Sequence, residues 1–250
     1  MSAVAALGGG LAAPGVPLPA PYYEDAKAGI TIFHGDCREI MPFLGPVDLV
    51  LTDPPYGIGA VWKGGWGHGW QTAREQSAMR NSWDGQPPDE QTLRVVLGKA
   101  KDAVIWGGNY FTLPVSRGWL VWNKPERGFS LAEGELAWTT RDNVLRIFDA
   151  VRSEPDREHP TQKPLSLMRW CLGFFPEAQT VLDPFMGSGT TLVAAKSLGR
   201  KAIGIEIEEK YCEIAARRLS QGVLAMEPQE VKQREGGSES PMLDGVAWDT

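Results

Sequence analysis

The chain has 250 residues, of which 42% are hydrophobic and 22% charged. This composition suffices for one sizeable globular core and excludes a fibrous or wholly disordered protein. The formal net charge is −6, but most of this net negative charge lies after residue 225, so the total neither indicates nor excludes a nucleic-acid partner. The apolar runs are of strand length, and the three scattered cysteines form no CxxC pair, so we expect a cytoplasmic protein without a membrane span, a disulfide framework or a metal site.

Residues 1–29 are rich in Ala, Gly and Pro, and we interpret them as a flexible N-terminal extension. The body from residue 30 to residue 225 alternates short β-branched or apolar runs with helical stretches. Strands are predicted over 30–34, 47–52, 103–106, 119–123, 136–139, 144–148, 180–182 and 201–207, and helices over 89–101, 165–174, 190–198 and 208–220. Such alternation is typical of an α/β fold, a mostly parallel twisted sheet with helices on both faces. Residues 226–250 read as an acidic, flexible C-terminal tail.

The segment 57–88 interrupts this alternation, because it is rich in Gly and Trp and has no sustained period. A loop of this length inside a compact domain is usually functional. We expect an insertion that becomes ordered on DNA, with Lys63, Arg74 and Arg80 at phosphates and Trp66 among the aromatic side chains that meet bases. The alternative is that its tryptophans form a satellite core or a subunit interface.

The first site with readable chemistry follows the apolar run 47–52 and consists of Asp53, Pro54, Pro55 and Tyr56. In open α/β sheets, ligands bind beyond the carboxyl ends of strands, where this tetrapeptide is expected to lie. The two prolines stiffen the turn, which presents the Asp53 carboxylate and the Pro54 carbonyl as acceptors. Two rigid acceptors beside an aromatic ring suit the amino group of a flat heterocycle. The alternative is a proline-rich turn with a solvated acid and a packed tyrosine.

The second site is a glycine turn between a predicted strand and a predicted helix, Asp183-Pro184-Phe185-Met186-Gly187-Ser188-Gly189-Thr190-Thr191. Its glycines let the backbone pass close to a ligand, but the Lys and Ser/Thr of a phosphate loop are missing. The next strand ends in Glu206, at the spacing where an acid accepts hydrogen bonds from ribose hydroxyls. An adenosine-bearing ligand without phosphates fits this pattern. The alternative reading of the glycines is tight packing of helix against strand.

Taken together, these motifs resemble the S-adenosylmethionine-dependent DNA amino-methyltransferases of the beta class, in which the DPPY motif precedes the DPFMGSGTT motif. Further matches in chain order are HGDC at 34–37, VIWGGNYF at 104–111, WLVWNKP at 119–125, HPTQKP at 159–164 and GIE at 204–206, so the resemblance covers about residues 30–220. It implies a Rossmann-like methyltransferase fold with circularly permuted motif order. It also implies S-adenosyl-L-methionine as cofactor and double-stranded DNA as partner, and it leaves open a homodimer and a restriction endonuclease partner.

The resemblance further assigns roles to residues. Asp53, Pro54, Pro55 and Tyr56 would grip the target base. The residues implied to bind the cofactor are Asp36, Cys37, Thr161, Lys163, Asp183, Phe185, Gly187, Ser188, Gly189, Thr190 and Glu206. Among these, Asp36 would accept a hydrogen bond from the adenine amine, Glu206 would bind the ribose, and residues 161–163 would approach the carboxylate. For Lys163 the alternative is a solvated lysine before a helix-starting proline.

The expected reaction is methyl transfer to the N6 amine of adenine at a specific DNA site, with the base flipped out of the duplex. Amino-methylation of cytosine at N4 is an alternative, because the same acceptors serve either amine. The Asp that opens the tetrapeptide favours adenine within the family resemblance. A non-catalytic DNA-binding or cofactor-binding module of the same fold is a second alternative, and an RNA or protein substrate a third.

Overall fold

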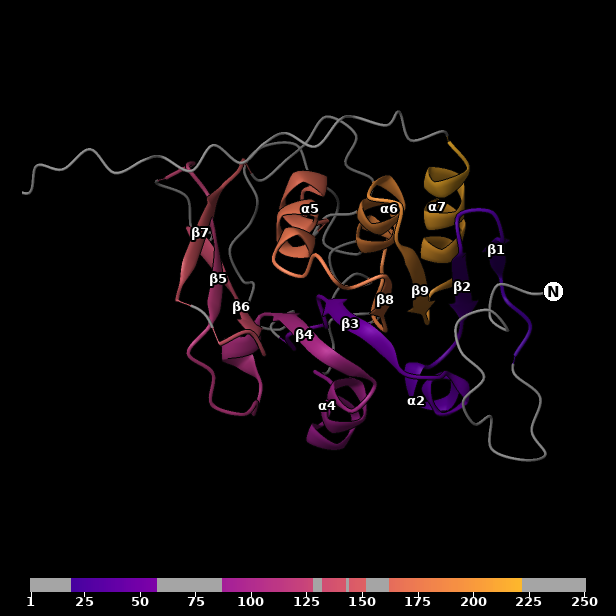
Figure 1. Ribbon diagram of the computed structural model, residues 1–250, viewed down its shortest axis with the longest axis horizontal. Helices are drawn as coiled ribbons and strands as arrows, with labels where there is room; N and C mark the ends of the chain where they lie inside the picture. Colours follow the sequence, from indigo (N-terminus) through magenta and orange to yellow (C-terminus); the bar gives the residue numbers. More distant parts are fainter. Residues whose placement is uncertain (1–18, 58–86, 128–131, 143, 152–161, 222–250) are drawn as a thin grey trace, which may run out of the picture.

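The computed structural model describes residues 19–57, 87–127, 132–142, 144–151 and 162–221. These residues form one sheet with helices packed on it (Figure 1). The strands are β1 (Tyr23–Asp25), β2 (Ile30–His34), β3 (Val47–Thr52), β4 (Ala100–Trp106), β5 (Trp119–Asn123), β6 (Gly134–Thr139), β7 (Arg146–Asp149), β8 (Thr180–Asp183) and β9 (Lys201–Glu206). The helices are α2 (Cys37–Ile40), α4 (Glu90–Leu97), α5 (Leu165–Gly173), α6 (Thr190–Ser197) and α7 (Glu209–Ser220), with 3-10 turns η1 (Met41–Phe43) and η2 (Gly108–Tyr110).

The strands lie in the order β1-β2-β9-β8-β3-β4-β6-β5-β7. The central neighbours from β2 to β4 all pair in parallel, whereas β1 pairs antiparallel with β2, and β6 pairs antiparallel with both β4 and β5. The predicted mostly parallel sheet is therefore confirmed. The parallel strands place their carboxyl ends along one edge, where ligands bind in such sheets.

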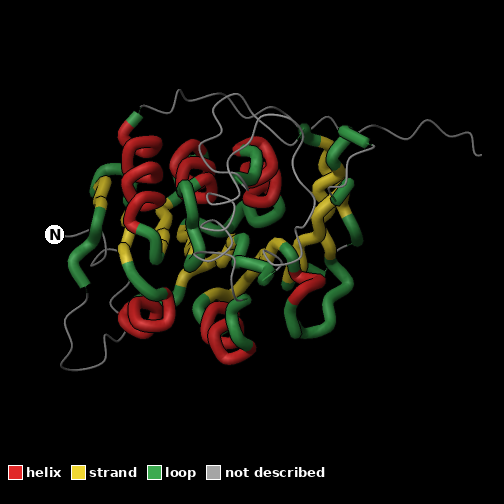
Figure 2. Tube along the Cα trace, turned by 180° about the vertical axis from the view of Figure 1, so that it is seen from behind, coloured by secondary structure: helices red, strands yellow, loops and turns green. Residues whose placement is uncertain are grey.

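Helices cover both faces of the sheet, as predicted. Helices α5, α6 and α7 lie on one face, and α2 and α4 lie on the other (Figures 1 and 2). The first layer buries Leu167 and Leu172 of α5 with Leu192 of α6, and the second buries Ile40 of α2 and Val96 of α4. Because the central strands are covered on both sides, their sequences are nearly continuous apolar runs.

The helix predicted over 89–101 is wrong at its carboxyl end. Helix α4 begins after Asp89, whose carboxylate accepts a hydrogen bond from the backbone N–H of Thr92, and it ends at Leu97. The N–H of Gly98 closes the last turn on the carbonyl of Arg94, and Ala100 already pairs with Val47 in the sheet. Strand pairing therefore overrides the helix propensity of the Lys-Ala-Lys segment.

The predicted start of the ordered domain at residue 30 is too late. Residues 23–25 pair antiparallel with β2, and the Asp25 carboxylate accepts a hydrogen bond from Lys196 of α6 at 2.8 Å. The remaining boundaries agree or shift by one to three residues, most at β4, predicted over 103–106 and observed at Ala100–Trp106. Within the described ranges, no helix combines the length and the apolar character that crossing a bilayer requires.

Candidate active site

The two predicted motifs leave the same edge of the sheet on neighbouring strands. β3 pairs in parallel with β8, with Val50 opposite Leu182, so the residues after each strand emerge side by side. The hydroxyl of Thr52 donates a hydrogen bond to the buried carboxylate of Asp183 at 2.7 Å, which ties the two strand ends together. The DPPY corner and the glycine turn therefore form one site.

The corner after β3 is packed by aromatic rings. The Tyr56 hydroxyl donates a hydrogen bond to Asp53 Oδ1. The Tyr56 ring stacks on Tyr110, with centroids 4.9 Å apart and planes 18° apart, and Phe111 meets it edge-on. Tyr110 was not among the predicted site residues, although it lies in one of the matched motifs. This stacking and hydrogen bonding fix Tyr56 and one oxygen of Asp53 relative to each other.

Gly107, between β4 and η2, makes room for this tyrosine. Its φ is +67°, and a Cβ built there would lie 2.1 Å from Cε1 of the Tyr56 ring. We expect Gly107→Ala to displace Tyr56 and lower any turnover at this corner by at least about tenfold, because misplacing a group by roughly 1 Å can cost that much or more. Initial rates and near-ultraviolet circular dichroism would check this. Gly173→Ala, which meets nothing within 4 Å, is the matched control, and equal rates for both variants would contradict the expectation.

Lys163 is buried beside the DPPY corner. The resemblance implied contact with the cofactor carboxylate, and the alternative was a solvated lysine. Instead its side chain is only 5% exposed, and its ammonium binds Asp53 Oδ2 and lies 3.0 Å from Glu135 Oε2. The alternative of a solvated lysine is therefore wrong, because the side chain turns inward toward the end of β3, whereas the implied contact with the cofactor carboxylate stays a prediction. Lys163 is therefore part of the DPPY corner.

Two further charged residues were missed by the sequence reasoning, Glu135 on β6 and Lys124 after β5. The ammonium of Lys124 binds Glu135 Oε1, so Glu135 stands between two lysines. Burial by itself would raise the pKa of Glu135, but the charges of Lys163 and Lys124 lower it to about 2. Burial raises the pKa of Asp53, the Lys163 charge opposes that rise, and the Glu135 charge adds to it.

The glycine turn after β8 is anchored by Glu206 at the end of β9. The N–H of Gly187 donates to Glu206 Oε2 at 2.9 Å, and the N–H of Glu208 donates to Oε1 at 2.8 Å. Within the described residues, a Cβ at Gly187 would meet nothing within 4 Å, whereas a Cβ at Gly189 would lie 2.7 Å from Ala215 Cβ. The described residues therefore leave space over Gly187, while glycine at 189 is required both by packing and by its φ of +77°.

The remaining residues of this turn are held by α7 and by the segment before α5. The guanidinium of Arg218 donates to the Ser188 carbonyl at 2.5 Å and to the Thr190 hydroxyl at 3.2 Å, and the Ser188 hydroxyl donates to Gln162 Oε1 at 3.1 Å. Burial raises the pKa of Asp183 to about 6. Because Gln162 contacts the glycine turn and the next residue contacts Asp53, the segment before α5 bridges the two halves of the site.

Asp36 and Cys37 lie at the adjoining end of β2, where His34 is opposite Glu206 and the N–H of Gly35 donates to the Glu206 carbonyl at 2.9 Å. The Asp36 carboxylate caps α2 by accepting from the N–H of Arg38 at 2.8 Å and forms an ion pair with its guanidinium. Asp36 is thus on the same edge as Glu206. Cys37 is buried in α2, and Phe185 is half-buried after β8.

Several predicted residues lie outside the described residues, namely Thr161, Lys63, Trp66, Arg74 and Arg80. Of the predicted insertion 57–88, only residues 57, 87 and 88 are described. The roles expected for these residues stay predictions.

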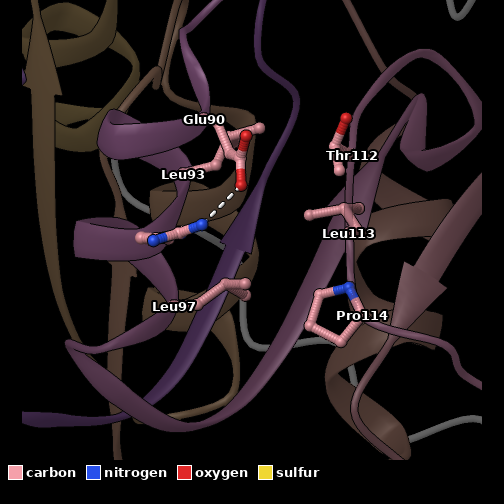
Figure 3. Close-up of a pocket in the computed structure, with 7 residues that line it drawn as sticks. Glu90, Leu93, Leu97, Thr112, Leu113 and Pro114 are labelled. Carbon is pink, nitrogen blue, oxygen red and sulfur yellow. Dashed lines mark hydrogen bonds and ion pairs between the residues drawn. The ribbon is translucent and has the colours of Figure 1, made fainter.

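A cavity of about 290 Å³ lies away from this site, between α4 and the segment after η2 (Figure 3). Glu90, Leu93 and Leu97 line it from the helix, and Thr112 and Pro114 line it from the opposite side. None of the residues predicted for the site lines this cavity, so we assign it no role in the chemistry.

Comparison with known proteins finds relatives that are described as methylases or methyltransferases. A family model described as DNA methylase matches residues 119–217. The chain is 31% identical over 223 residues to YubD of Escherichia coli, which is described as a methylase, covering 78% of this chain and 92% of the relative. It is 27% identical to the type II methyltransferase M2.LlaDCHI of Lactococcus lactis subsp. cremoris, covering 83% of this chain and 95% of that protein.

Solved structures share the fold. The M1.HpyAVI–SAM complex is 23% identical and covers 76% of this chain and 98% of its own, with a TM-score of 0.52. PvuII DNA methyltransferase, described as cytosine-N4-specific, is 17% identical and covers 76% and 86%, with a TM-score of 0.51. The chain therefore shares their Rossmann-like fold, with the DPPY corner ahead of the glycine turn in the sequence. The chain belongs to the DNA methylase family of amino-methyltransferases.

Proposed function

We propose that this protein transfers a methyl group from S-adenosylmethionine to the exocyclic N6 amine of adenine in DNA, at a specific site and with the base flipped out of the duplex. One observation carries the proposal: the acceptor corner at Asp53 and the glycine turn at Gly187 stand on neighbouring parallel strands joined by the Thr52–Asp183 hydrogen bond. A bound base and a bound cofactor would then face each other across one strand spacing.

In this reaction the DPPY corner would act by accepting hydrogen bonds from the target amine. The exocyclic amine is a poor nucleophile, because its lone pair is delocalised into the ring. Asp53 and the Pro54 carbonyl would accept hydrogen bonds from the two N–H groups of the amine. These bonds would draw the nitrogen toward tetrahedral geometry and stabilise the positive charge that develops on it. Rate enhancement then comes from orientation and from acceptors placed in advance. Tyr56, held by Tyr110, would stack against the extruded base.

The residues at the neighbouring strand ends fit the cofactor. Each Glu206 oxygen accepts one backbone N–H and keeps a second lone pair for a ribose hydroxyl. The space over Gly187 leaves room for the methionine portion, and Asp36 stands at the adjoining strand end, where an adenine amine could donate to it. The cofactor supplies an electrophilic methyl group, and the chain's part is to bind and orient it opposite Asp53. Cys37, Asp183, Phe185, Ser188, Gly189 and Thr190 complete the proposed cofactor site, together with Thr161.

We extend the proposal to the DNA contacts. The insertion 57–88, with Lys63, Trp66, Arg74 and Arg80, would meet the phosphates and bases around the flipped nucleotide. It leaves the sheet directly after the DPPY corner and rejoins the described chain before α4, so both of its ends lie at the domain that carries the site. Charge-reversal of Arg74 and Arg80 is the natural first test of this assignment.

Product analysis tests the base preference. Unmethylated DNA is incubated with the protein and labelled cofactor, digested to nucleosides and analysed by mass spectrometry. We expect N6-methyl-2′-deoxyadenosine as the labelled product. N4-methylcytosine would overturn the adenine assignment while keeping the enzyme class. Absence of any labelled product, with cofactor binding intact, would instead support the non-catalytic alternative.

A further inference from the structure

The acceptor corner contains a buried ammonium for which the proposed chemistry has no direct use. Lys163 stands just before α5 and reaches across to the end of β3, where it binds Asp53 Oδ2. Its nitrogen also lies 3.0 Å from Glu135 Oε2 and 3.4 Å from the Tyr56 hydroxyl. The segment after β3 and strand β6 therefore converge on one lysine that is almost wholly enclosed by protein.

The charges around this lysine form a balanced group. Two carboxylates, Asp53 and Glu135, alternate with two ammonium groups, Lys163 and Lys124, in one connected chain of ion pairs. The group is formally neutral as a whole. Removing Lys163 alone would leave two partly buried carboxylates beside each other with one lysine to share, and such a pair favours protonation of one of them.

Protonation of Asp53 would disable the corner. A protonated carboxyl is a weaker acceptor than a carboxylate and cannot stabilise a positive charge on the amine nitrogen. Burial raises the pKa of Asp53 and the Lys163 charge opposes that rise, so the adjacent cation favours the ionised form. Lys163 is the cation that touches it.

We propose that Lys163 is a positioning residue that keeps Asp53 ionised and aims its carboxylate, and that Glu135, tied to Lys124, holds Lys163 in place from the other side. This inference rests on the proposed function, because it explains how the acceptor in that reaction is kept ready. The other titratable groups near this cluster are Tyr56, which donates to Asp53 Oδ1, the Asp183 carboxyl and the Cys171 thiol.

The test compares the pH dependence of methyl transfer at saturating cofactor and DNA for the full-length wild type, Lys163→Met, Lys163→Arg and the double variant Lys163→Met with Glu135→Gln. For the wild type we expect a rate that varies little between about pH 6 and 8, roughly one unit either side of neutrality. Lys163→Met should acquire an acid limb in which the rate falls about tenfold for each pH unit below the new pKa. Lys163→Arg, which keeps the charge, should show no such limb.

The double variant shows whether the effect of Lys163→Met comes from the lost charge or from damage to the fold. Because Glu135→Gln removes the neighbouring negative charge, its acid limb should lie at lower pH than that of Lys163→Met. Circular dichroism and cofactor binding show whether Lys163→Met folds. If it does not, the proposal is tested by the other two variants: an acid limb in the double variant and no acid limb in Lys163→Arg supports it. Lys101→Met, an exposed lysine near the opposite end of the sheet, is the matched control.

Two outcomes overturn the inference. One is a loss of rate in Lys163→Met, or in the double variant, by the same factor at every pH, which is the mark of a purely structural lysine. The other is an equal acid limb in Lys163→Arg. Failure of the proposed function looks different, because the wild type itself would then transfer no methyl group to DNA at any pH while still binding the cofactor.

Discussion

Asp53→Asn is expected to reduce methyl transfer at least about a hundredfold, the loss typical when one preorganised electrostatic group is removed from a transition state. The asparagine side chain has nearly the same shape, but it lacks the negative charge and presents an NH₂ group at one of its two polar positions. It can no longer accept from the amine and from Tyr56 and pair with Lys163 at once. Single-turnover transfer of labelled methyl to DNA measures the chemical step.

The same variant should leave cofactor binding almost unchanged, because Asp53 does not touch Glu206 or Gly187, which anchor the glycine turn. Calorimetric titration with the cofactor checks this separation. Asp142→Asn is the matched control, since that carboxylate is 73% exposed and only 3.5 Å from Arg117 in a surface ion pair of little energetic consequence. Unimpaired transfer by Asp53→Asn would contradict the role assigned to the corner.

The sequence could predict the central elements because their pattern is strong. The runs at Val47–Thr52 and Trp119–Asn123 are apolar or β-branched and bounded by Pro, Gly or charged residues, and both strands have the predicted bounds. The start of β4 was misassigned because Ala100 and Lys101 are good helix formers, and only pairing with β3 makes them a strand. Local propensity contains no information about that partner.

The site was predictable in part for the same reason. The DPPY corner and the glycine turn were each readable as strand-end turns, and a parallel sheet puts strand ends at one edge. Their adjacency depends on the order of β3 and β8, which spacing along the chain does not give. The pairing of Lys163 with Asp53 spans 110 positions and needs the inward turn before α5. Glu135 stood just outside the strand predicted over 136–139, so the sequence pattern contained no sign of its ion pair with Lys163.

Glu206→Gln is expected to give the opposite pattern to Asp53→Asn, weakening cofactor binding while sparing the chemical step. Glutamine has one acceptor oxygen for the two backbone N–H groups of Gly187 and Glu208 that the carboxylate now satisfies, and any ribose hydroxyl would compete for the same atom. Losing one charge-assisted hydrogen bond of about 1.5–3 kcal/mol raises the Kd roughly 10-fold to 150-fold.

Calorimetry should therefore show a large rise in the Kd for the cofactor, whereas the rate at saturating cofactor should stay within a few-fold of the wild type. Glu208→Gln is the matched control, because its half-buried carboxylate is only in a loose ion pair with Lys210 at 3.7 Å. An unchanged Kd in Glu206→Gln would remove the reason for placing the cofactor over Gly187. Because Asp53 and Glu206 stand at the ends of β3 and β9, with β8 between them, opposite losses in rate and affinity would assign the base to one side of β8 and the cofactor to the other.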